Sequence, residues 1–176
     1  MILNIFLSVL VICLIVLAIR SLWSIRSFAP WVPAFKKDIQ RIFQVADLKS
    51  GEVFYDLGCG DGRMVLYAGK NFTVQAIGIE FLFPLFVVCK IRQIFSGGKN
   101  IEFKKKNLFH EKISSADVVY VFGLPHTLAQ GLKEKFKKEL KPGARVVSYA
   151  FQIQGLVPEV IDKPGKKYNA IYRYRF

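Results

Sequence analysis

The sequence has few residues that bind metal ions or form disulfides. Its 176 residues include three cysteines and two histidines. Cys13, Cys59 and Cys89 are scattered along the chain, and no pair has the spacing of a zinc site or a disulfide framework. His110 and His126 cannot complete a zinc site with them. We therefore expect no bound metal and a reducing environment.

Acidic residues are also scarce, with 13 acidic against 26 basic residues and a formal net charge of +13. The basic residues cluster within residues 104–106, 133–141 and 163–175. Such a surface suits anionic lipid headgroups, nucleic acid or an acidic protein, and is equally consistent with an ordinary solvated face. Together with the apolar N-terminus described next, it favours lipid headgroups as a partner.

The N-terminus lacks charge over residues 2–19. A helix of this length rises about 27 Å, close to the thickness of a bilayer's hydrocarbon core. Neither the basic start nor the small-x-small cleavage site of a signal peptide is present. We therefore expect residues 1–23 to form one uncleaved transmembrane anchor. By the positive-inside rule, the basic residues that follow place the rest of the chain in the cytoplasm: Arg20, Arg26, Lys36 and Lys37.

The most informative segment is residues 53–63, where an apolar strand runs into a turn with glycine at every second position, Gly58, Gly60 and Gly62. A second apolar run, residues 73–79, ends in Glu80. A strand, glycine turn, helix, strand and acid in this order hold nucleoside-containing cofactors, with the acid on the ribose. Because Asp56 precedes the turn and would repel a phosphate, the site suits a cationic ligand.

Alternating strands and helices predict an α/β fold with a doubly wound, mostly parallel sheet. Residues 24–36 form a juxtamembrane segment, and residues 37–176 form the globular domain. A β-hairpin around Lys163-Pro-Gly-Lys166 would add an antiparallel edge. The expected helices are 35–46, 62–70, 82–96 and 126–140, and the expected strands before the hairpin are 53–57, 74–80, 101–106, 117–122 and 144–150.

The segment Asp56-Leu-Gly-Cys-Gly-Asp-Gly62 resembles motif I of class I S-adenosylmethionine (SAM) methyltransferases. The resemblance implies a seven-stranded Rossmann-like methyltransferase sheet and SAM as cofactor. It implies that the first acid and the glycine turn hold the methionine part of SAM and that Glu80 holds the ribose. The cofactor-binding residues expected are Asp56, Gly58, Cys59, Gly60, Asp61, Gly62, Glu80, Phe81, Asn107 and Leu108, with Asn107 at the adenine edge and Phe81 a candidate to stack on the adenine ring.

The apolar N-terminus, the segment Ala29-Pro-Trp-Val-Pro33 and the glycine turn together are similar to the ATP synthase c-subunit and adenine nucleotide translocase lysine methyltransferases. That resemblance implies a lysine acceptor on a protein in or at the membrane. Candidate residues for the substrate channel are Pro30, Trp31, Pro33 and His126. The alternative is that the proline segment only packs the anchor and that His126 lies on the surface.

Three other functions remain open at this point. A lipid, quinone or other small-molecule methyltransferase would fit the apolar N-terminus equally well. A non-catalytic SAM-binding membrane module is the other alternative, although the intact Asp56, glycine turn and Glu80 argue against it. The charge would fit a nucleic-acid methyltransferase. However, Gly123-Leu-Pro-His126 lacks the Asn/Asp-Pro-Pro-aromatic loop typical of nucleic-acid amino methyltransferases, which disfavours nucleic acid as a partner.

Overall fold

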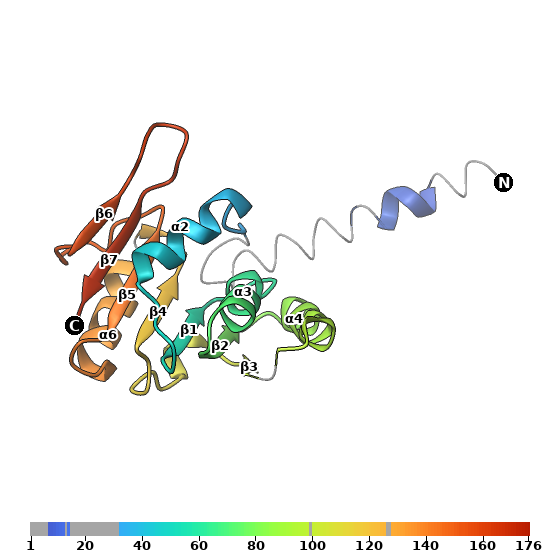
Figure 1. The fold of residues 1–176 in the computed structure, drawn as a ribbon. Coiled ribbons are helices and arrows are strands. Elements are labelled where there is room, and N and C mark those ends of the chain that lie inside the picture. The colour runs from blue at the N-terminus through green and yellow to red at the C-terminus, as the bar shows by residue number, and fades with distance from the viewer. Residues whose placement is uncertain (1–6, 13, 15–31, 99, 126–127) are drawn as a thin grey trace. The chain divides into compact units, whose positions relative to one another are not determined.

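The computed structural model describes residues 7–12, 14, 32–98, 100–125 and 128–176. The chain divides into two units, residues 1–30 and 31–176. In the first unit, residues 7–12 and 14 are helical. The second unit contains the sheet and the remaining helices shown in Figure 1.

The predicted single-pass membrane localisation is contradicted. Within the described residues, no helix is both long and apolar enough to cross a membrane. Most of the expected anchor, residues 1–6, 13 and 15–23, lies outside the described residues. The prediction rests on hydropathy alone, which reports how apolar a segment is and not which structure it adopts.

Seven strands form one sheet in the order β3-β2-β1-β4-β5-β7-β6 (Figure 1). The first five are parallel to one another, whereas β7 runs antiparallel to both β5 and β6. This confirms the predicted seven-stranded mixed sheet with its antiparallel hairpin. The strands are β1 (Val53–Leu57), β2 (Gln75–Glu80), β3 (Ile101–Lys105), β4 (Val118–Val121), β5 (Arg145–Tyr149), β6 (Val160–Asp162) and β7 (Ile171–Arg175).

Helices cover both faces of this sheet, so the parallel strands are apolar on both sides. One face contacts α2 (Lys36–Ala46), α3 (Arg63–Asn71) and α4 (Phe83–Ser96). A buried cluster joins these helices to inward side chains such as Phe54, Tyr120 and Tyr149. The π-helix η2 (Leu128–Leu132) and α6 (Lys133–Glu139) contribute the buried Leu128, Leu132 and Phe136, which lie outside that cluster. The short η1 (Leu108–His110) links β3 to the loop before β4.

The segment expected to be one helix, residues 126–140, differs from the prediction. Residues 126 and 127 lie outside the described residues, and the part that follows begins as a π-helix before α6. A Cβ on Gly131 would lie 2.5 Å from the ring of Phe109. Periodicity predicts a helix here but not its wider first turn, because the approach of Phe109 is a contact between distant segments.

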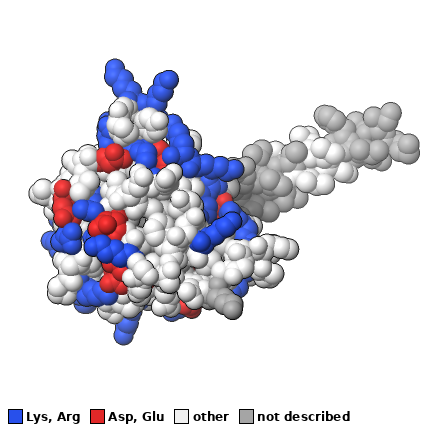
Figure 2. Space-filling model, in the orientation of Figure 1, with Lys and Arg blue, Asp and Glu red and all other residues white. Residues whose placement is uncertain are grey.

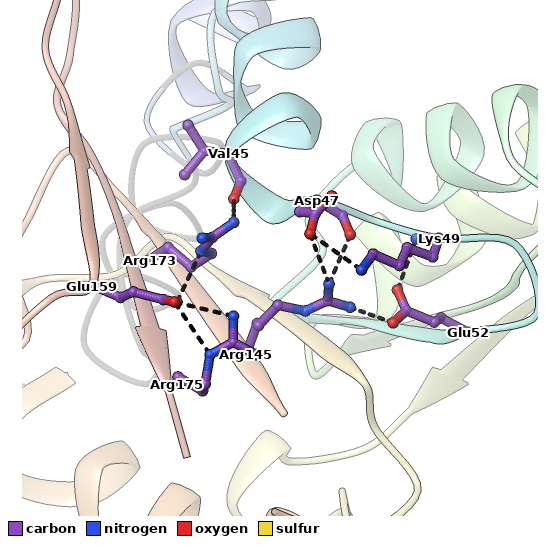
Figure 3. Close-up of polar contacts among 8 residues, drawn as sticks. All are labelled: Val45, Asp47, Lys49, Glu52, Arg145, Glu159, Arg173 and Arg175. Atoms are coloured by element: carbon purple, nitrogen blue, oxygen red, sulfur yellow. Dashed lines mark hydrogen bonds and ion pairs between the residues drawn. The ribbon is translucent and has the colours of Figure 1, made fainter. Parts of the chain in front are cut away.

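The amino-terminal edge of the sheet is held by two arginines, the buried Arg145 and the half-buried Arg173 (Figure 3). Arg145, at the start of β5, donates to the carbonyl of Asp47 at 2.7 Å and pairs with the Glu52 carboxylate at 2.5 Å. Arg173 of β7 donates to the carbonyl of Val45 at 2.9 Å. These contacts fix the C-terminal end of α2 to β5 and β7.

Strand register places the functional residues at the opposite edge. Leu57 pairs with Val121, and Val121 pairs with Ser148, so the carboxyl ends of β1, β4 and β5 lie at one level. Side chains alternate between faces along a strand. As a result Asp56 and Tyr120, which are paired in register, point to the same face, the one covered by α2 and α3.

Candidate cofactor site

Glu80 is the acid that links the end of β2 to the glycine turn. It is the last residue of β2 and is 6% exposed. One carboxylate oxygen accepts the Gly60 N–H at 2.8 Å, and the other accepts the Leu82 N–H at 2.8 Å. Burial raises the pKa of Glu80, although these backbone donors act in the opposite direction. A carboxylate offers about four lone-pair sites, so two remain for hydroxyl groups of a ligand.

The glycine turn follows from local backbone geometry. Gly58, Gly60 and Gly62 all have positive φ, at 87°, 56° and 75°. Glycine adopts this region without the steric penalty of a Cβ. The N–H groups of Gly58 and Cys59 both donate to the carbonyl of Ile79, at 2.9 and 3.0 Å, which fixes the turn to β2.

Asp56 lies beneath this turn, and among the residues that the structure describes no cation lies beside it. It is 2% exposed, and its pKa is raised well above the ordinary value, first by burial and then by the negative charges of Glu80 and Asp61. An ionised carboxylate in such surroundings is stabilised by a bound positive charge. This site therefore fits a ligand that carries a cation, such as the sulfonium and ammonium groups of SAM.

Asp61 behaves differently from the other two acids. Its carboxylate pairs with Arg63 and with Arg92, both at 2.8 Å. Burial alone would raise its pKa, but the hydrogen bond and charge of Arg63, with Arg92, lower it. Arg63 also donates to the carbonyl of Ala34 at 2.9 Å. Asp61 thus neutralises two arginines and links the glycine turn to the segment before α2.

These opposite pKa shifts predict opposite stability effects. Because the folded protein holds the Asp56 proton to higher pH than the unfolded chain, the stability of the free protein falls as pH rises through the raised pKa. Asp56→Asn removes the charge and should raise the melting temperature at pH 7.5 by about 2–4 °C, the shift that roughly 1 kcal/mol gives in a domain of this size. The difference should vanish at a pH below the ordinary aspartate pKa.

Asp61→Asn is the matched control for that measurement, and thermal melts from about pH 2.5 to 8, a range that extends below the ordinary aspartate pKa, test both. The lowered pKa of Asp61 means that its contribution is present at neutral pH and is lost as pH falls through the folded value. This variant should therefore melt below the wild type at pH 7.5. Equal melting temperatures for wild type and Asp56→Asn at that pH would show that the buried Asp56 charge does not destabilise the free protein.

The remaining predicted site residues differ in exposure, and some lie outside the described residues. Phe81 follows Glu80 and is 52% exposed, whereas Leu108 is buried. The Asn107 side-chain oxygen accepts the Phe109 N–H at 3.0 Å, which leaves its NH2 group and one oxygen lone pair for a ligand. Pro33 is half-buried in the segment that leads to α2. Pro30, Trp31 and His126 lie outside the described residues.

Two features of the site are absent from the predictions made on the sequence, and the first is a pair of cysteines. The Sγ atoms of Cys59 and Cys89 lie 4.0 Å apart, and the Cys89 thiol donates to the Gly60 carbonyl at 3.1 Å. This links α4 to the glycine turn. No spacing rule could have found the pair, because the residues lie on different elements. Among the described residues there is no group of three or more His, Cys, Asp or Glu that could hold a metal ion.

Tyr120 is the second feature that sequence reasoning missed. Its hydroxyl is buried and has no hydrogen-bond partner among the residues that the structure describes. Burial and the nearby Asp56 charge raise its pKa well above the ordinary value, so the hydroxyl stays protonated. Buried polar groups are nearly always paired, and an unpaired one next to a ligand site fits a polar group of the ligand.

The sheet order, the glycine turn and the acids at the ends of β1 and β2 define a class I SAM-dependent methyltransferase. Comparison with known proteins gives the family. The family model described as "ANTKMT methyltransferase domain" matches residues 56–160. The chain belongs to this family.

Relatives and a solved structure support this membership. A protein-lysine N-methyltransferase of Saccharolobus islandicus is 37% identical, covering 82% of this chain and 92% of the relative. The human lysine N-methyltransferase of the ATP synthase c-subunit is 31% identical over 77% of this chain, but the match covers only 58% of that protein. An RNA methyltransferase from Salinibacter ruber, solved with S-adenosyl-L-homocysteine, has a TM-score of 0.77 and 31% identity, covering 82% of this chain and 93% of that one.

Proposed function

We propose that this SAM-dependent methyltransferase transfers methyl groups to lysine side chains of a protein. The observation that carries the acceptor class is the 37% identity to a relative named as a protein-lysine N-methyltransferase, over nearly the whole length of that relative. The match to the enzymes named for the ATP synthase c-subunit points the same way, although the chain spans only about three fifths of their length.

We propose that SAM lies across the glycine turn, with its ribose on Glu80 and its cationic end towards Asp56. Two oxygens of Glu80 keep free lone pairs for the ribose hydroxyls, and the buried Asp56 gains a counter-charge. Gly58, Cys59, Gly60 and Gly62 bring the backbone close to the ligand, while Asp61 holds the turn through Arg63. Phe81, Asn107 and Leu108 lie in the segments that follow β2 and β3, where the adenine would meet them.

The main task of the protein in this reaction is to align the methyl group of SAM with the acceptor amine. When bound, SAM supplies a methyl group on a positively charged sulfur that a nearby amine displaces in line. Holding the two reactants in position can equal an effective concentration of about 10⁵–10⁸ M. The acceptor lysine must also lose a proton, which costs roughly 4 kcal/mol near pH 7.4 because its ordinary pKa is about 10.4. A dry site supplies part of this energy, since burial disfavours the charged amine.

Tyr120→Phe tests whether the unpaired hydroxyl belongs to this site. The variant should be at least as stable as the wild type, because an unpaired buried hydroxyl costs about 1–3 kcal/mol. Its methyl-transfer rate should fall about tenfold, because the hydroxyl then no longer meets a polar group of SAM or of the acceptor. Thermal melts and initial rates measure the two effects.

Tyr174→Phe is the control for that variant. The Tyr174 hydroxyl accepts the Ile153 N–H at 2.8 Å, so its loss should destabilise the fold by about 1 kcal/mol and leave methyl transfer unchanged. If Tyr120→Phe were less stable than the wild type and fully active, the Tyr120 hydroxyl would be structural and the assignment wrong.

RNA is the second candidate acceptor, favoured by two observations. The Salinibacter ruber structure, named as an RNA methyltransferase, is as similar in sequence as the human lysine enzyme. In addition, Figure 2 shows lysine and arginine side chains gathered at the tip of the β6–β7 hairpin and scattered, among acidic ones, around the face in view. A surface of this sign attracts phosphate.

The experiment that separates the two uses tritiated SAM with purified protein and three separate acceptors: total protein, total RNA and total lipid. Label recovered as methyl-lysine after hydrolysis of the protein, and absent with Glu80→Gln, supports the proposal. Label in RNA nucleosides instead would favour the second candidate, and label in lipid would overturn both. The enzyme is first shown to bind SAM by calorimetry, so that a failed preparation is recognised.

A further inference from the structure

Three aromatic residues gather beside the cofactor site, at the carboxyl ends of β4 and β5. Phe122 directly follows β4, Tyr149 ends β5, and Phe151 lies two residues further. Because Leu57, Val121 and Ser148 are aligned across β1, β4 and β5, Phe122 and Tyr149 lie at the level of Gly58. By strand alternation they face the same side of the sheet as Asp56.

The ring of Phe122 contacts the rings of both Tyr149 and Phe151. Phe122 and Tyr149 meet edge to face, with centroids 5.0 Å apart and an interplanar angle of 84°. Phe122 and Phe151 are stacked at 24°, with centroids 6.5 Å apart. Tyr149 is buried and Phe122 is half-buried, whereas Phe151 is 37% exposed. The cluster therefore runs from the interior of the site towards solvent.

An unusual backbone conformation holds Phe151 in this place. Ala150, between Tyr149 and Phe151, has φ of 69°, a region that residues with a Cβ rarely adopt. The conformation is fixed by two hydrogen bonds: the Ala150 N–H donates to the Ala170 carbonyl at 2.8 Å, and the Ser148 hydroxyl donates to the Phe151 carbonyl at 2.6 Å. Such strain persists where the surroundings enforce it, and it clusters at functional sites.

Tyr149 is held from behind by a buried carboxylate. Its hydroxyl donates to Asp38 at 2.6 Å and accepts from the Asn169 amide at 3.0 Å. Asp38, on α2 and fully buried, also pairs with Arg41 at 2.6 Å. Burial and this carboxylate raise the pKa of Tyr149 to about 12, so the phenol remains neutral. The ring is therefore a fixed, uncharged surface.

We infer that Phe122 and Phe151 line the acceptor-lysine channel, with the buried Tyr149 holding Phe122 from behind, a role that rests on the proposed lysine specificity. The apolar rings contact the aliphatic stem of lysine, and their faces attract its ammonium group and the methylated ammonium that forms. The open end at Phe151 admits the side chain from solvent. The inner end at Phe122 lies at the level of Gly58 in the glycine turn, beside which the methyl group is transferred.

The test compares Phe122→Leu and Phe151→Leu with a control, Phe95→Leu. Leucine keeps an apolar side chain but removes the aromatic face. Phe95 lies on α4 and is 85% exposed, away from this edge of the sheet. Initial rates are measured with tritiated SAM and a dilution series of total protein extract. Methyl-lysine is quantified as mono-, di- and trimethyl forms, and the SAM dissociation constant is measured by calorimetry.

We expect both site variants to lose about tenfold or more in apparent kcat/KM for the extract and to yield fewer methyl groups per lysine. Their SAM dissociation constants should stay within about twofold of the wild type, and Phe95→Leu should match the wild type throughout. If the wild type forms methyl-lysine but the site variants resemble Phe95→Leu, the inference is wrong. If the wild type labels RNA and no lysine, the proposed function has failed instead, and the rings would serve another acceptor.

Discussion

Glu80→Gln is expected to weaken SAM binding at least about 100-fold while leaving the sheet folded. The variant loses charge-assisted hydrogen bonds to the ribose, each worth about 1.5–3 kcal/mol. In addition, the new amide group must face the N–H of either Gly60 or Leu82, both of which now donate to the carboxylate. The NH2 group of the glutamine then faces a backbone N–H, and neither donor has an acceptor.

Calorimetry with SAM measures this effect, and thermal melts give a second readout. At 100 times its dissociation constant, a ligand stabilises the fold by about 2.7 kcal/mol, which raises the melting temperature of a domain of this size by roughly 5–11 °C. The wild type should show this shift and Glu80→Gln should not. Glu102→Gln, on the neighbouring strand β3 and exposed, is the control and should bind normally. A dissociation constant for Glu80→Gln within about threefold of the wild type would show that Glu80 does not bind SAM.

The second large effect is expected at the other edge of the sheet. Glu52→Ala should destabilise the protein by about 3 kcal/mol, which lowers the melting temperature by roughly 6–12 °C. Arg145 is 5% exposed and loses its closest carboxylate, as Figure 3 shows. Asp47 lies 3.6 Å from the same guanidinium but is half exposed, so it compensates only in part.

Binding and melting measurements on this variant separate stability from function. Because Glu52 precedes β1 and lies at the amino edge, the folded variant should bind SAM with wild-type affinity. Glu134→Ala is the control, since its exposed pair with Lys137 at 3.7 Å contributes little. A double variant, Glu52→Leu with Arg145→Met, should recover most of the loss, as apolar replacements of buried pairs often do. An unchanged melting temperature for Glu52→Ala would mean that Arg145 is satisfied without it.

The elements of the fold are largely predictable from local sequence. Strand β1 has the predicted bounds, and α2, α3, α4, β2, β3, β4 and β5 agree with their predictions within one or two residues. Pro84 lies at the start of α4 and Gly97 ends it with φ of 67°, as the chemistry of helix ends predicts. These features depend on neighbours in the chain, so sequence periodicity and turn residues report them directly.

The prediction of a single-pass membrane localisation is wrong, and it too came from local sequence. An uncharged run at residues 2–19 suggests a membrane span, but hydropathy does not decide which partner an apolar segment finds. The substrate-channel residues Pro30, Trp31 and His126 stay a prediction, because they lie outside the described residues.

The sequence by itself determined the sheet, the glycine turn and the acids beside it, because each is set by backbone preferences and spacing within a short stretch. Only the tertiary structure decided which acids are free to act. It pairs Asp61 with Arg63 and Arg92 and, within the described part of the chain, leaves Asp56 buried with no cation beside it. It also joins Phe122, Tyr149 and Phe151 into one surface and fixes it through Asp38, more than a hundred residues before Tyr149. Such contacts arise when distant strands and helices pack together, and no local pattern encodes them.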